Sequence, residues 1–318
     1  MWVRSIFSLP GSDAKEALLD LSDLTFRGNI VAQEPLSRHT SLKVGGPADL
    51  FAVPADADDL LKLVSWLDER GIHRVVIGGG YNLLVRDGGL RGAVISLERL
   101  NRIESLDSPG AAGGMVRAEA GAENLAVVRF AQERGFGGIG FIAGIPGTIG
   151  GAVRMNAGAY GEGLLERAVE LTLVRTGEVV RYPMGEIDFG YRRIRLLPGD
   201  IILALTLHLE ERDPEATEAE IRKDLELRRT KHAVGHPSAG SFFKNPPGQA
   251  AWRLIDQAGL RGVQIGGAQV SEVHSNFLIN RGGATARDFL ELAALVKERV
   301  RAVAGVELEE EVRILGEE

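Results

Sequence analysis

Three polar side chains in the second half of the chain stand where a side chain can take part in chemistry. Arg192 ends the segment Phe-Gly-Tyr-Arg, and its planar guanidinium can bind two oxygens of a carboxylate or phosphate. Ser241 follows a glycine and precedes two phenylalanines, which places a hydroxyl at a flexible turn beside bulky walls. Glu311 lies in an acidic run near the C-terminus. Each residue also has an interpretation without function. Arg192 could be a solvated surface arginine, Ser241 a turn former, and Glu311 part of a solvated acidic face.

The residues around Glu311 predict a strand with one apolar face. Leu308, Val312 and Ile314 share one parity of the chain, as the buried side of a strand does. Glu311 has the opposite parity, so its carboxylate faces away from that core. The side that it faces is either solvent or a site that binds a ligand.

A glycine-rich run occupies residues 141–161, with the sequence FIAGIPGTIGGAVRMNAGAYG. Glycine lets the backbone approach a ligand closely and adopt positive φ, and a run of such turns exposes N–H groups that bind anions. We therefore expect a diphosphate here, with tight structural packing as the alternative. The run has no lysine and no Gly-Lys-Ser/Thr, so it is not a P-loop.

A second glycine cluster, at residues 78–80, follows the β-branched stretch 75–77 and forms a phosphate-sized turn at the end of a strand. The dinucleotide fingerprint Gly-x-Gly-x-x-Gly would need glycine at Leu83, and no helical pattern follows. A Rossmann fold is therefore not predicted.

The elements around these clusters predict an α/β lobe followed by a mostly β lobe. In the first lobe, Asp56 caps a helix with Leu60, Val64 and Leu67 on one face and a stop at Gly71. The second lobe contains a hairpin that turns at residues 176–177, and a change of composition at 210–217 marks its end. The other predicted strands lie at 93–97, 115–120, 201–209 and 276–280, and the other helices at 123–134, 218–229, 249–258 and 286–302.

The composition excludes several classes of protein. No cysteine is present, so disulfides, thiolate catalysis and cysteine-bound metals are ruled out, and the histidines show no metal-binding spacing. A net charge of −7 argues against nucleic-acid binding. No apolar run is long enough to span a bilayer and no signal peptide is recognisable, so we expect a cytoplasmic protein that binds no membrane and no metal.

Five segments, in a fixed order, resemble one enzyme family. They are AGIPGTIGGAVRMNAGAYG, FGYR, AGSFFKNP, GAQVSEVHSNFLIN and LEEEVRILG. Taken together and in this order, the segments resemble the UDP-N-acetylenolpyruvoylglucosamine reductase family, MurB. The resemblance covers residues 40–316. The stretch from Arg192 to Ile201 is short, so the chain resembles the subgroup that lacks a tyrosine loop closing on the nucleotide.

The resemblance implies an α+β fold. A two-lobed FAD-binding domain of the vanillyl-alcohol-oxidase or PCMH type would precede a C-terminal α/β substrate domain. On this plan an N-terminal extension covers residues 1–30, the FAD-binding domain covers 31–212 with its lobes dividing near residue 100, and the substrate domain covers 213–318.

The resemblance also implies a reaction. NADPH, as co-substrate, would reduce a non-covalently bound FAD. The reduced flavin would then give hydride to the enolpyruvyl double bond of UDP-N-acetylglucosamine enolpyruvate, which yields UDP-N-acetylmuramate for peptidoglycan synthesis. The enzyme is expected to act as a cytoplasmic monomer.

Site residues carry over by motif. Ser241 corresponds to the proton donor, while Arg192 and Glu311 correspond to the catalytic pair at the substrate carboxylate. The implied substrate-binding residues are Tyr191, Asn245, Arg261 and His274. The implied cofactor-binding residues are Gly78, Gly79, Gly80, Tyr81, Asn82, Gly144, Ile145, Pro146, Gly147, Thr148, Gly150, Gly151, Asn156, Gly158 and Ala159. Tyr81 departs from the family, which often has serine at this position.

Two rival functions remain open on sequence grounds. One is a flavin oxidase on the same fold, although neither glycine cluster has the cysteine or histidine that a covalent flavin needs. The other is a nucleotide-sugar-binding protein without activity, against which the joint presence of Ser241, Arg192 and Glu311 argues.

Overall fold

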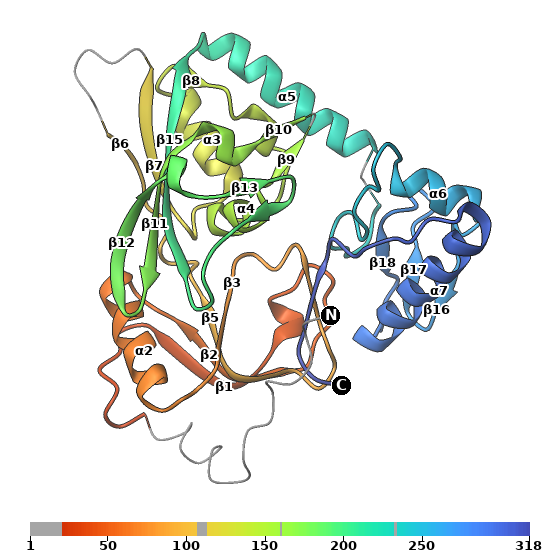
Figure 1. Cartoon of the computed structure of the whole chain (residues 1–318), viewed down its shortest axis with the longest axis horizontal. Helices are drawn as coiled ribbons and strands as arrows, with labels where there is room; N and C mark the ends of the chain where they lie inside the picture. Colours follow the sequence, from red (N-terminus) through yellow and green to blue (C-terminus); the bar gives the residue numbers. More distant parts are fainter. Residues whose placement is uncertain (1–20, 107–112, 160, 232–233) are drawn as a thin grey trace.

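The computed structural model describes residues 21–106, 113–159, 161–231 and 234–318. Two sheet-containing lobes lie one above the other, and a C-terminal domain lies beside them (Figure 1). Residues 1–20 of the predicted N-terminal extension lie outside the described residues. The last strand of the first lobe's sheet ends at Ser96, and the first strand of the second lobe's sheet begins at Ile103.

The first lobe is built on a sheet in the order β1-β2-β5-β3, in which β1 is antiparallel to β2 and the other neighbours are parallel. Helix α2 begins after Asp56, whose side chain accepts the N–H of Asp59 at 3.0 Å, and it buries Leu60, Val64 and Leu67 as predicted. The elements are β1 (Asn29–Pro35), β2 (Pro47–Val53), α2 (Ala57–Glu69), β3 (Arg74–Ile77), β4 (Leu83–Val85) and β5 (Leu90–Ser96).

The second lobe contains a sheet in the order β12-β11-β15-β7-β6. The predicted hairpin is confirmed: Thr176 and Gly177 have φ of 47° and 78°, as a two-residue turn with left-handed residues requires. Its elements are β6 (Ile103–Ser105), β7 (Gly114–Glu119), α3 (Asn124–Gln132), β8 (Phe136–Gly137), α4 (Ile149–Met155), β9 (Gly158–Ala159), β10 (Glu162–Gly163), β11 (Ala168–Arg175), β12 (Glu178–Pro183), β13 (Phe189–Gly190), β14 (Arg193–Ile194) and β15 (Ile201–Glu211). Short 3₁₀ helices lie in this lobe at Gly140–Ile142, Leu164–Arg167 and Met184–Glu186, and in the first lobe at Leu36–Arg38.

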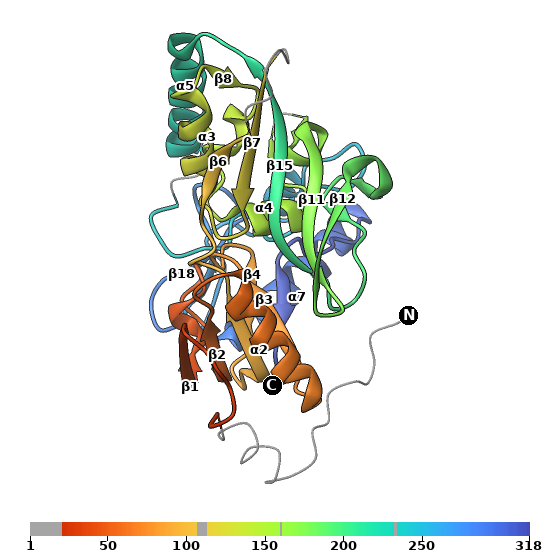
Figure 2. The ribbon, with the colours of Figure 1, turned by 90° about the vertical axis from the view of Figure 1, so that its left-hand side faces the viewer.

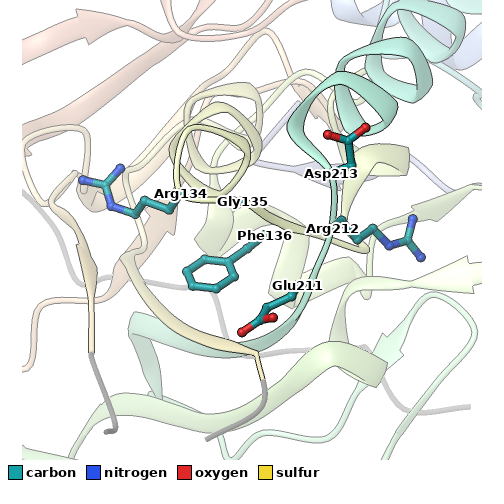
Figure 3. Close-up of a pocket in the computed structure, with 6 residues that line it drawn as sticks. All are labelled: Arg134, Gly135, Phe136, Glu211, Arg212 and Asp213. Atoms are coloured by element: carbon teal, nitrogen blue, oxygen red, sulfur yellow. The ribbon is translucent and has the colours of Figure 1, made fainter. Parts of the chain in front are cut away.

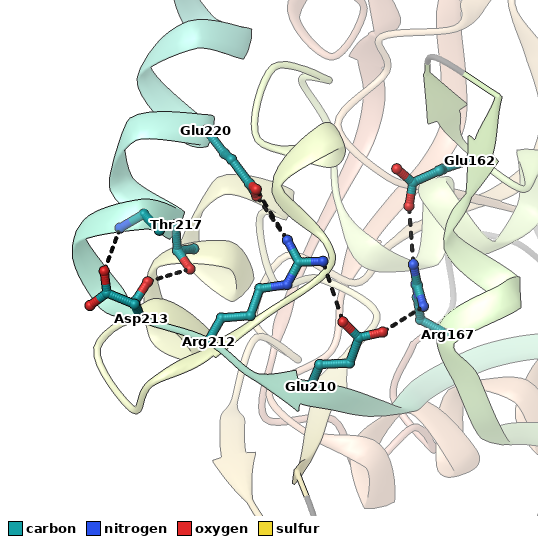
Figure 4. Close-up of polar contacts among 8 residues, drawn as sticks. Glu162, Arg167, Glu210, Arg212, Asp213, Thr217 and Glu220 are labelled. Atoms are coloured by element: carbon teal, nitrogen blue, oxygen red, sulfur yellow. Dashed lines mark hydrogen bonds and ion pairs between the residues drawn. The ribbon is translucent and has the colours of Figure 1, made fainter.

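Helix α5 (Pro214–Lys231) packs on the second lobe, beside α3 (Figure 2). Ile221 is fully buried in that lobe's core. A row of alternating charges lies beside the start of the helix: Arg212 contacts both Glu220 of the helix and Glu210 before it, and Glu210 also contacts Arg167 (Figure 4). Such exposed pairs stabilise little, so the burial of Ile221, with Leu225 packed against the same core, contributes more to the attachment. The predicted boundary at residues 212–213 therefore precedes a helix that belongs, by packing, with the second lobe.

The C-terminal domain contains a small antiparallel sheet in the order β16-β17-β18, on which helix α7 packs, and helix α6 packs against α7. Phe242, Phe243 and Phe289 are fully buried in its core. The elements are α6 (Ala251–Gln257), β16 (Gln264–Ile265), β17 (Ala268–Val270), β18 (Leu278–Asn280), α7 (Ala286–Ala304) and β19 (Arg313–Leu315). None of the described helices is both long and apolar enough to cross a membrane.

The chain's last strand returns from the C-terminal domain to the first lobe, where β19 pairs in parallel with β4 (Figure 1). A second contact joins the first lobe to the C-terminal domain. The carboxylate of Asp87, which follows β4, accepts the N–H groups of Ala286 and Arg287 at 2.8 and 3.0 Å, at the start of α7. An acidic side chain is stabilising at a helix N-terminus because the first N–H groups have no partner within the helix.

The glycine-rich run differs from the expected series of turns, because residues 149–155 form helix α4. A Cβ added at Gly150 would lie only 2.9 Å from the Cβ of Ala120, so this glycine lets the helix approach the end of β7. The structural alternative therefore explains Gly150. Strand β1 was also not predicted, and it begins within the segment assigned to the extension.

Replacing Asp87 by alanine should lower the free energy of unfolding by about 1–2 kcal/mol, the usual value of a helix-capping acid. Denaturant unfolding followed by far-ultraviolet circular dichroism would measure it. Glu291→Ala is the matched control, because the contact that the described residues give Glu291 is an exposed ion pair with Arg287 on the same helix. This substitution should lower the free energy of unfolding by less than about 0.5 kcal/mol. Equal losses in the two variants would contradict a specific role for Asp87.

Candidate active site

The two glycine clusters come together between the lobes. A Cβ added at Gly78 would lie 2.6 Å from the Thr148 hydroxyl oxygen, and one at Gly79 would lie 3.7 Å from the Cα of Gly147. No side chain fits at Gly78 without displacing Thr148 of the glycine-rich run. The ring of Tyr81 lies beside both turns, 45% exposed. The backbone at Gly78 and Gly79 therefore lies beside the backbone at Gly147 and Thr148, although the two segments are distant in the sequence.

Unsatisfied polar atoms accompany this junction. The Thr148 hydroxyl is buried, and no described residue hydrogen-bonds to it. Asn124 holds the second turn, because its side-chain amide donates to the carbonyl of Ile145 at 2.9 Å and its own N–H donates to Gly147 at 3.0 Å. A buried hydroxyl without a partner beside closely packed glycines suits a ligand oxygen. These residues therefore fit a phosphate-bearing cofactor.

Arg192 and Glu311, which lie 119 positions apart in the sequence numbering, meet at one contact. The Nε of Arg192 lies 2.8 Å from Oε1 of Glu311, and both side chains are mostly buried, 22% and 15% exposed. The Nε–H bond is not directed at this oxygen, so the contact is an ion pair and not an aligned hydrogen bond. One group comes from the second lobe, and the other precedes the C-terminal strand. The strand predicted around Glu311 is shorter than expected, because β19 begins only at Arg313, so Glu311 lies in the irregular segment before it. Leu308 and Val312 are buried, as the predicted apolar face required.

The turn that carries Arg192 is fixed by the end of the glycine-rich run. Asn156 ends α4 with a left-handed φ of 39°, and its side-chain amide donates to the carbonyl of Gly190 at 3.1 Å. Arg192 also has a left-handed φ, 54°, and its Nη1 donates to the carbonyl of Gly158 at 3.1 Å. Asn156 and Gly158, which were predicted to bind the cofactor, thus hold the arginine in this structure. The side chain of Ala159 lies outside the described part of the chain.

Glu311 is held from two sides by backbone contacts. Its N–H donates to the carbonyl of Phe242 at 2.8 Å, and its carbonyl accepts the side-chain amide of Asn82 at 3.1 Å. Asn82 follows the glycine cluster at residues 78–80 in the first lobe, so that lobe reaches Glu311 directly. Nothing in the sequence motif of Asn82 pointed to this contact.

Ser241 lies next to Phe242 and therefore close in the chain to the residue that holds Glu311. Gly240 before it has a φ of 75°, the conformation that needs glycine. Among the described residues, none hydrogen-bonds to the Ser241 hydroxyl. Lys244, three residues on, forms an ion pair with Glu309 at 3.1 Å.

The surroundings of Glu311 change its acidity. Burial raises the pKa of Glu311, and the positive charges of Arg192 and Lys244 oppose that rise. Burial is the larger effect, because removing a carboxylate from water disfavours its charged form. The acid therefore holds a proton to a higher pH than an exposed glutamate does.

The four implied substrate-binding residues lie in different settings. Tyr191 is 66% exposed, with the Arg192 guanidinium 5.3 Å from its ring centre. The side chain of Asn245 accepts the N–H of Ala251 at 3.0 Å, at the start of α6. Arg261 pairs with Asp256 at 2.6 Å, and the ring of His274 packs edge-on against Phe277. The contacts described for Asn245, Arg261 and His274 all lie within the C-terminal domain.

An open pocket of about 560 Å³ lies elsewhere, where β15 meets α5 (Figure 3). Its lining mixes cations and acids on an exposed surface, and it contains none of the predicted site residues. The lining residues are Arg134, Gly135, Phe136, Glu211, Arg212 and Asp213. Across the described ranges, no cluster of histidine, aspartate or glutamate side chains has the form of a metal site.

Comparison with known proteins connects this geometry to one family. The family model for the UDP-N-acetylenolpyruvoylglucosamine reductase C-terminal domain matches residues 232–315, and the model for an FAD binding domain matches residues 48–182. These matches, with the two lobes and the separate C-terminal domain, confirm the predicted fold class.

Individual relatives agree with the family models. The chain is 65% identical over 300 residues to UDP-N-acetylenolpyruvoylglucosamine reductase of Pelobacter propionicus, covering 94% of this chain and 100% of that protein. The reductase of Geobacter metallireducens is 55% identical over 92% of this chain and 96% of its own length. The crystal structure of the Thermus caldophilus reductase, MurB, superposes with a TM-score of 0.76 at 33% identity, covering 91% of this chain and 98% of that one.

Gly78→Ala should weaken FAD binding by about 10-fold or more, because the added methyl displaces the Thr148 hydroxyl where the two turns meet. The FAD content of the purified protein, and its affinity after reconstitution, would measure the effect. Gly185→Ala is the matched control, since a Cβ there meets no atom within 4 Å. Full FAD content and parental affinity in Gly78→Ala would contradict the assignment of this junction to the cofactor.

Proposed function

The chain belongs to the UDP-N-acetylenolpyruvoylglucosamine reductase family, and on that premise we propose that Arg192, Glu311 and Ser241 form its reaction centre. The protein is an FAD-dependent oxidoreductase that uses NADPH to reduce UDP-N-acetylglucosamine enolpyruvate to UDP-N-acetylmuramate, a step of peptidoglycan synthesis. The observation that carries the proposal is the ion pair between Arg192 and Glu311, at 2.8 Å across two domains.

The glycine junction supplies the site for the cofactor. Backbone at Gly78, Gly79 and Gly147, with the Thr148 hydroxyl, would hold the FAD diphosphate, because the glycines leave room and the hydroxyl lacks a partner. When bound, FAD supplies hydride transfer from NADPH to the double bond of the substrate. The remaining steps below concern side chains of this chain.

Arg192 would stabilise the charge that develops in the substrate. Hydride addition to the terminal carbon of the enolpyruvyl group pushes electron density onto the carboxylate, which gives an enediolate-like state. A fixed cation beside that carboxylate stabilises this state more than the ground state, and such preorganised electrostatics is usually the largest catalytic effect. The hydrogen bond from Arg192 to Gly158 and the ion pair with Glu311 would hold the guanidinium in place beforehand.

Glu311 would have two roles that depend on its protonation. As a carboxylate it orients Arg192 and balances its charge. Burial raises the pKa of Glu311, so a larger fraction is protonated at a given pH than for an exposed glutamate, and the protonated form can donate to the substrate carboxylate. Its position suits either role, because backbone from Phe242 and the amide of Asn82 fix the segment.

Ser241 would deliver the proton that completes the reduction. The carbon that bears the ether oxygen must receive a proton after hydride addition, and a hydroxyl at short range can donate it. Support for this role comes from the position of Ser241 beside Phe242 and from a hydroxyl that no described residue engages. Lys244 is occupied by Glu309, so its contribution to the acidity of Ser241 would be electrostatic and not a direct contact.

We further propose that the enzyme works as a cytoplasmic monomer on UDP-N-acetylglucosamine enolpyruvate. A single chain contributes every group of the proposed reaction centre, so no second copy is required. The cytoplasm contains the NADPH that the reaction consumes.

Stopped-flow absorbance of the flavin tests both the function and the role of Ser241. The parent protein should bleach with NADPH and regain its colour when UDP-N-acetylglucosamine enolpyruvate is added. Ser241→Ala should bleach at nearly the parental rate, because reduction by NADPH needs no proton donor. Its reoxidation by the enolpyruvyl sugar should slow by about 10²–10⁴-fold, the value of a general acid.

Matched controls separate the possible failures. Ser238→Ala, in the same loop, should change neither phase, since Ser238 is not part of the proposed centre. Equal slowing of both phases in Ser241→Ala would indicate a structural role for Ser241. A parent protein that fails to reoxidise with the enolpyruvyl sugar would contradict the proposed substrate itself.

A further inference from the structure

Asn276 is a buried asparagine whose side-chain amide pairs with the backbone of Phe243. Its Nδ2 donates to the Phe243 carbonyl at 2.8 Å, and its Oδ1 accepts the Phe243 N–H at 3.0 Å. Asn276 is only 3% exposed, so both bonds form away from bulk water. At this length, only the amide of asparagine offers both an N–H donor and a carbonyl acceptor at neutral pH.

The backbone of Asn276 adds a third hydrogen bond to the same loop, because its carbonyl accepts the N–H of Phe242 at 2.7 Å. Phe242 and Phe243 directly follow Ser241, and both rings are fully buried in the core of the C-terminal domain. Hydrogen bonds from one residue therefore fix the two positions that follow the Ser241 hydroxyl.

The segment that carries Asn276 is itself held on both sides. The hydroxyl of Ser275, before it, donates to the carbonyl of Trp252 in α6 at 2.8 Å. The carbonyl of Phe277, after it, accepts the N–H of Ser271 at 2.9 Å. Ser271 and Ser275 are buried, so these bonds are also shielded from water. Asn276 is therefore a fixed point from which the neighbouring loop can be positioned.

Ser241 lies between two attachments of its loop to this segment. On one side Ser238 forms an antiparallel bridge with Ile279, and on the other Asn276 holds the two phenylalanines. Between them Gly240 has a left-handed φ of 75°. Glycine gives the backbone the most freedom at this point, so the attachment at Asn276 is the nearer constraint on the hydroxyl.

The same loop reaches the proposed reaction centre. The carbonyl of Phe242 accepts the N–H of Glu311 at 2.8 Å, while the N–H of Phe242 donates to Asn276. Phe242 thus connects Asn276 with the acid that pairs with Arg192. Accurate placement matters here, because a displacement of about 1 Å can slow a reaction by about 10²-fold.

We propose that Asn276 is a positioning residue for the reduction of the enolpyruvyl sugar. Its amide fixes the loop so that the Ser241 hydroxyl stands at the carbon that receives the proton. Asn276 acts through the backbone of Phe242 and Phe243 and not by contact with the substrate. The inference rests on the proposed function, under which Ser241 is the proton donor.

Stopped-flow absorbance of the flavin in Asn276→Asp tests the proposal. The substitution keeps the size of the side chain and an acceptor for the N–H of Phe243, but it removes the donor to the carbonyl. Reduction by NADPH should proceed at nearly the parental rate, and reoxidation by the enolpyruvyl sugar should slow by about 10-fold to 10²-fold. The sugar concentration that gives half of the maximal rate should stay within about 2-fold of the parent, because binding is not affected.

The Ser241→Ala background separates positioning of the hydroxyl from a general loss of structure. If Asn276 acts through Ser241, no hydroxyl remains to be misplaced in that background. Adding Asn276→Asp should then slow reoxidation by no more than about 2-fold further.

Asn280→Asp is the matched control, because Asn280 is a buried asparagine of the same segment with different contacts. Its amide donates to the carbonyl of Leu42 at 3.0 Å and accepts the N–H of Gly282 at 2.9 Å. The control should lose stability and change neither phase. Asn276→Ser is a milder variant, which should show the same pattern with a smaller loss if Asn276→Asp does not fold.

Three results would overturn the inference. They are parental reoxidation in a folded, FAD-loaded variant of Asn276, equal slowing of both phases, and losses that multiply when Asn276→Asp is combined with Ser241→Ala. The proposed function is judged separately, because reoxidation of the parent by the enolpyruvyl sugar and its slowing in Ser241→Ala are measured without any change at position 276.

Discussion

The ion pair between Arg192 and Glu311 depends on both lobes and on the C-terminal domain. The second lobe supplies the arginine, on a turn fixed by Asn156. The segment before the last strand supplies the acid, held by Phe242 of the C-terminal domain and by Asn82 of the first lobe. A mostly buried ion pair is weak evidence of stabilisation, because desolvation of both charges offsets their attraction. Its position is better explained by function: a cation for the substrate carboxylate must be fixed before the substrate arrives.

The same contacts connect the cofactor site with the reaction centre. The segment that starts with the glycine cluster 78–80 contributes Gly78 to the junction with Thr148, and four residues later Asn82 contacts Glu311. The glycine-rich run contributes Thr148 to the junction, and at its end Asn156 fixes the turn of Arg192. Each of the two segments therefore contributes both to the cofactor site and to the contacts that fix Arg192 or Glu311. The pairing of β19 with β4 closes the arrangement by returning the chain to the first lobe.

Local chemistry made much of the fold predictable, and the contacts between distant segments were not. Asp56 and the apolar face beginning at Leu60 specify α2 by themselves, and Thr176-Gly177 specifies a hairpin. The parity of Glu311 indicated which way it points, but only the fold brings Arg192 to it. Helix α4 was missed because Gly150 and Gly151 disfavour a helix locally, whereas close packing on Ala120 requires glycine at position 150. The contact of Asn156 with the turn of Arg192 likewise depends on tertiary structure, which no local pattern encodes.

A double-mutant cycle on Arg192 and Glu311 tests the central claim most directly. The measured quantity is the rate at which UDP-N-acetylglucosamine enolpyruvate reoxidises the reduced flavin in Arg192→Gln, Glu311→Gln and the double variant. If the two residues act as one unit, the double variant should be about as slow as the slower single variant, with a coupling free energy of about 1–3 kcal/mol. Rate losses that multiply in the double variant would show that the residues act independently and would contradict the claim.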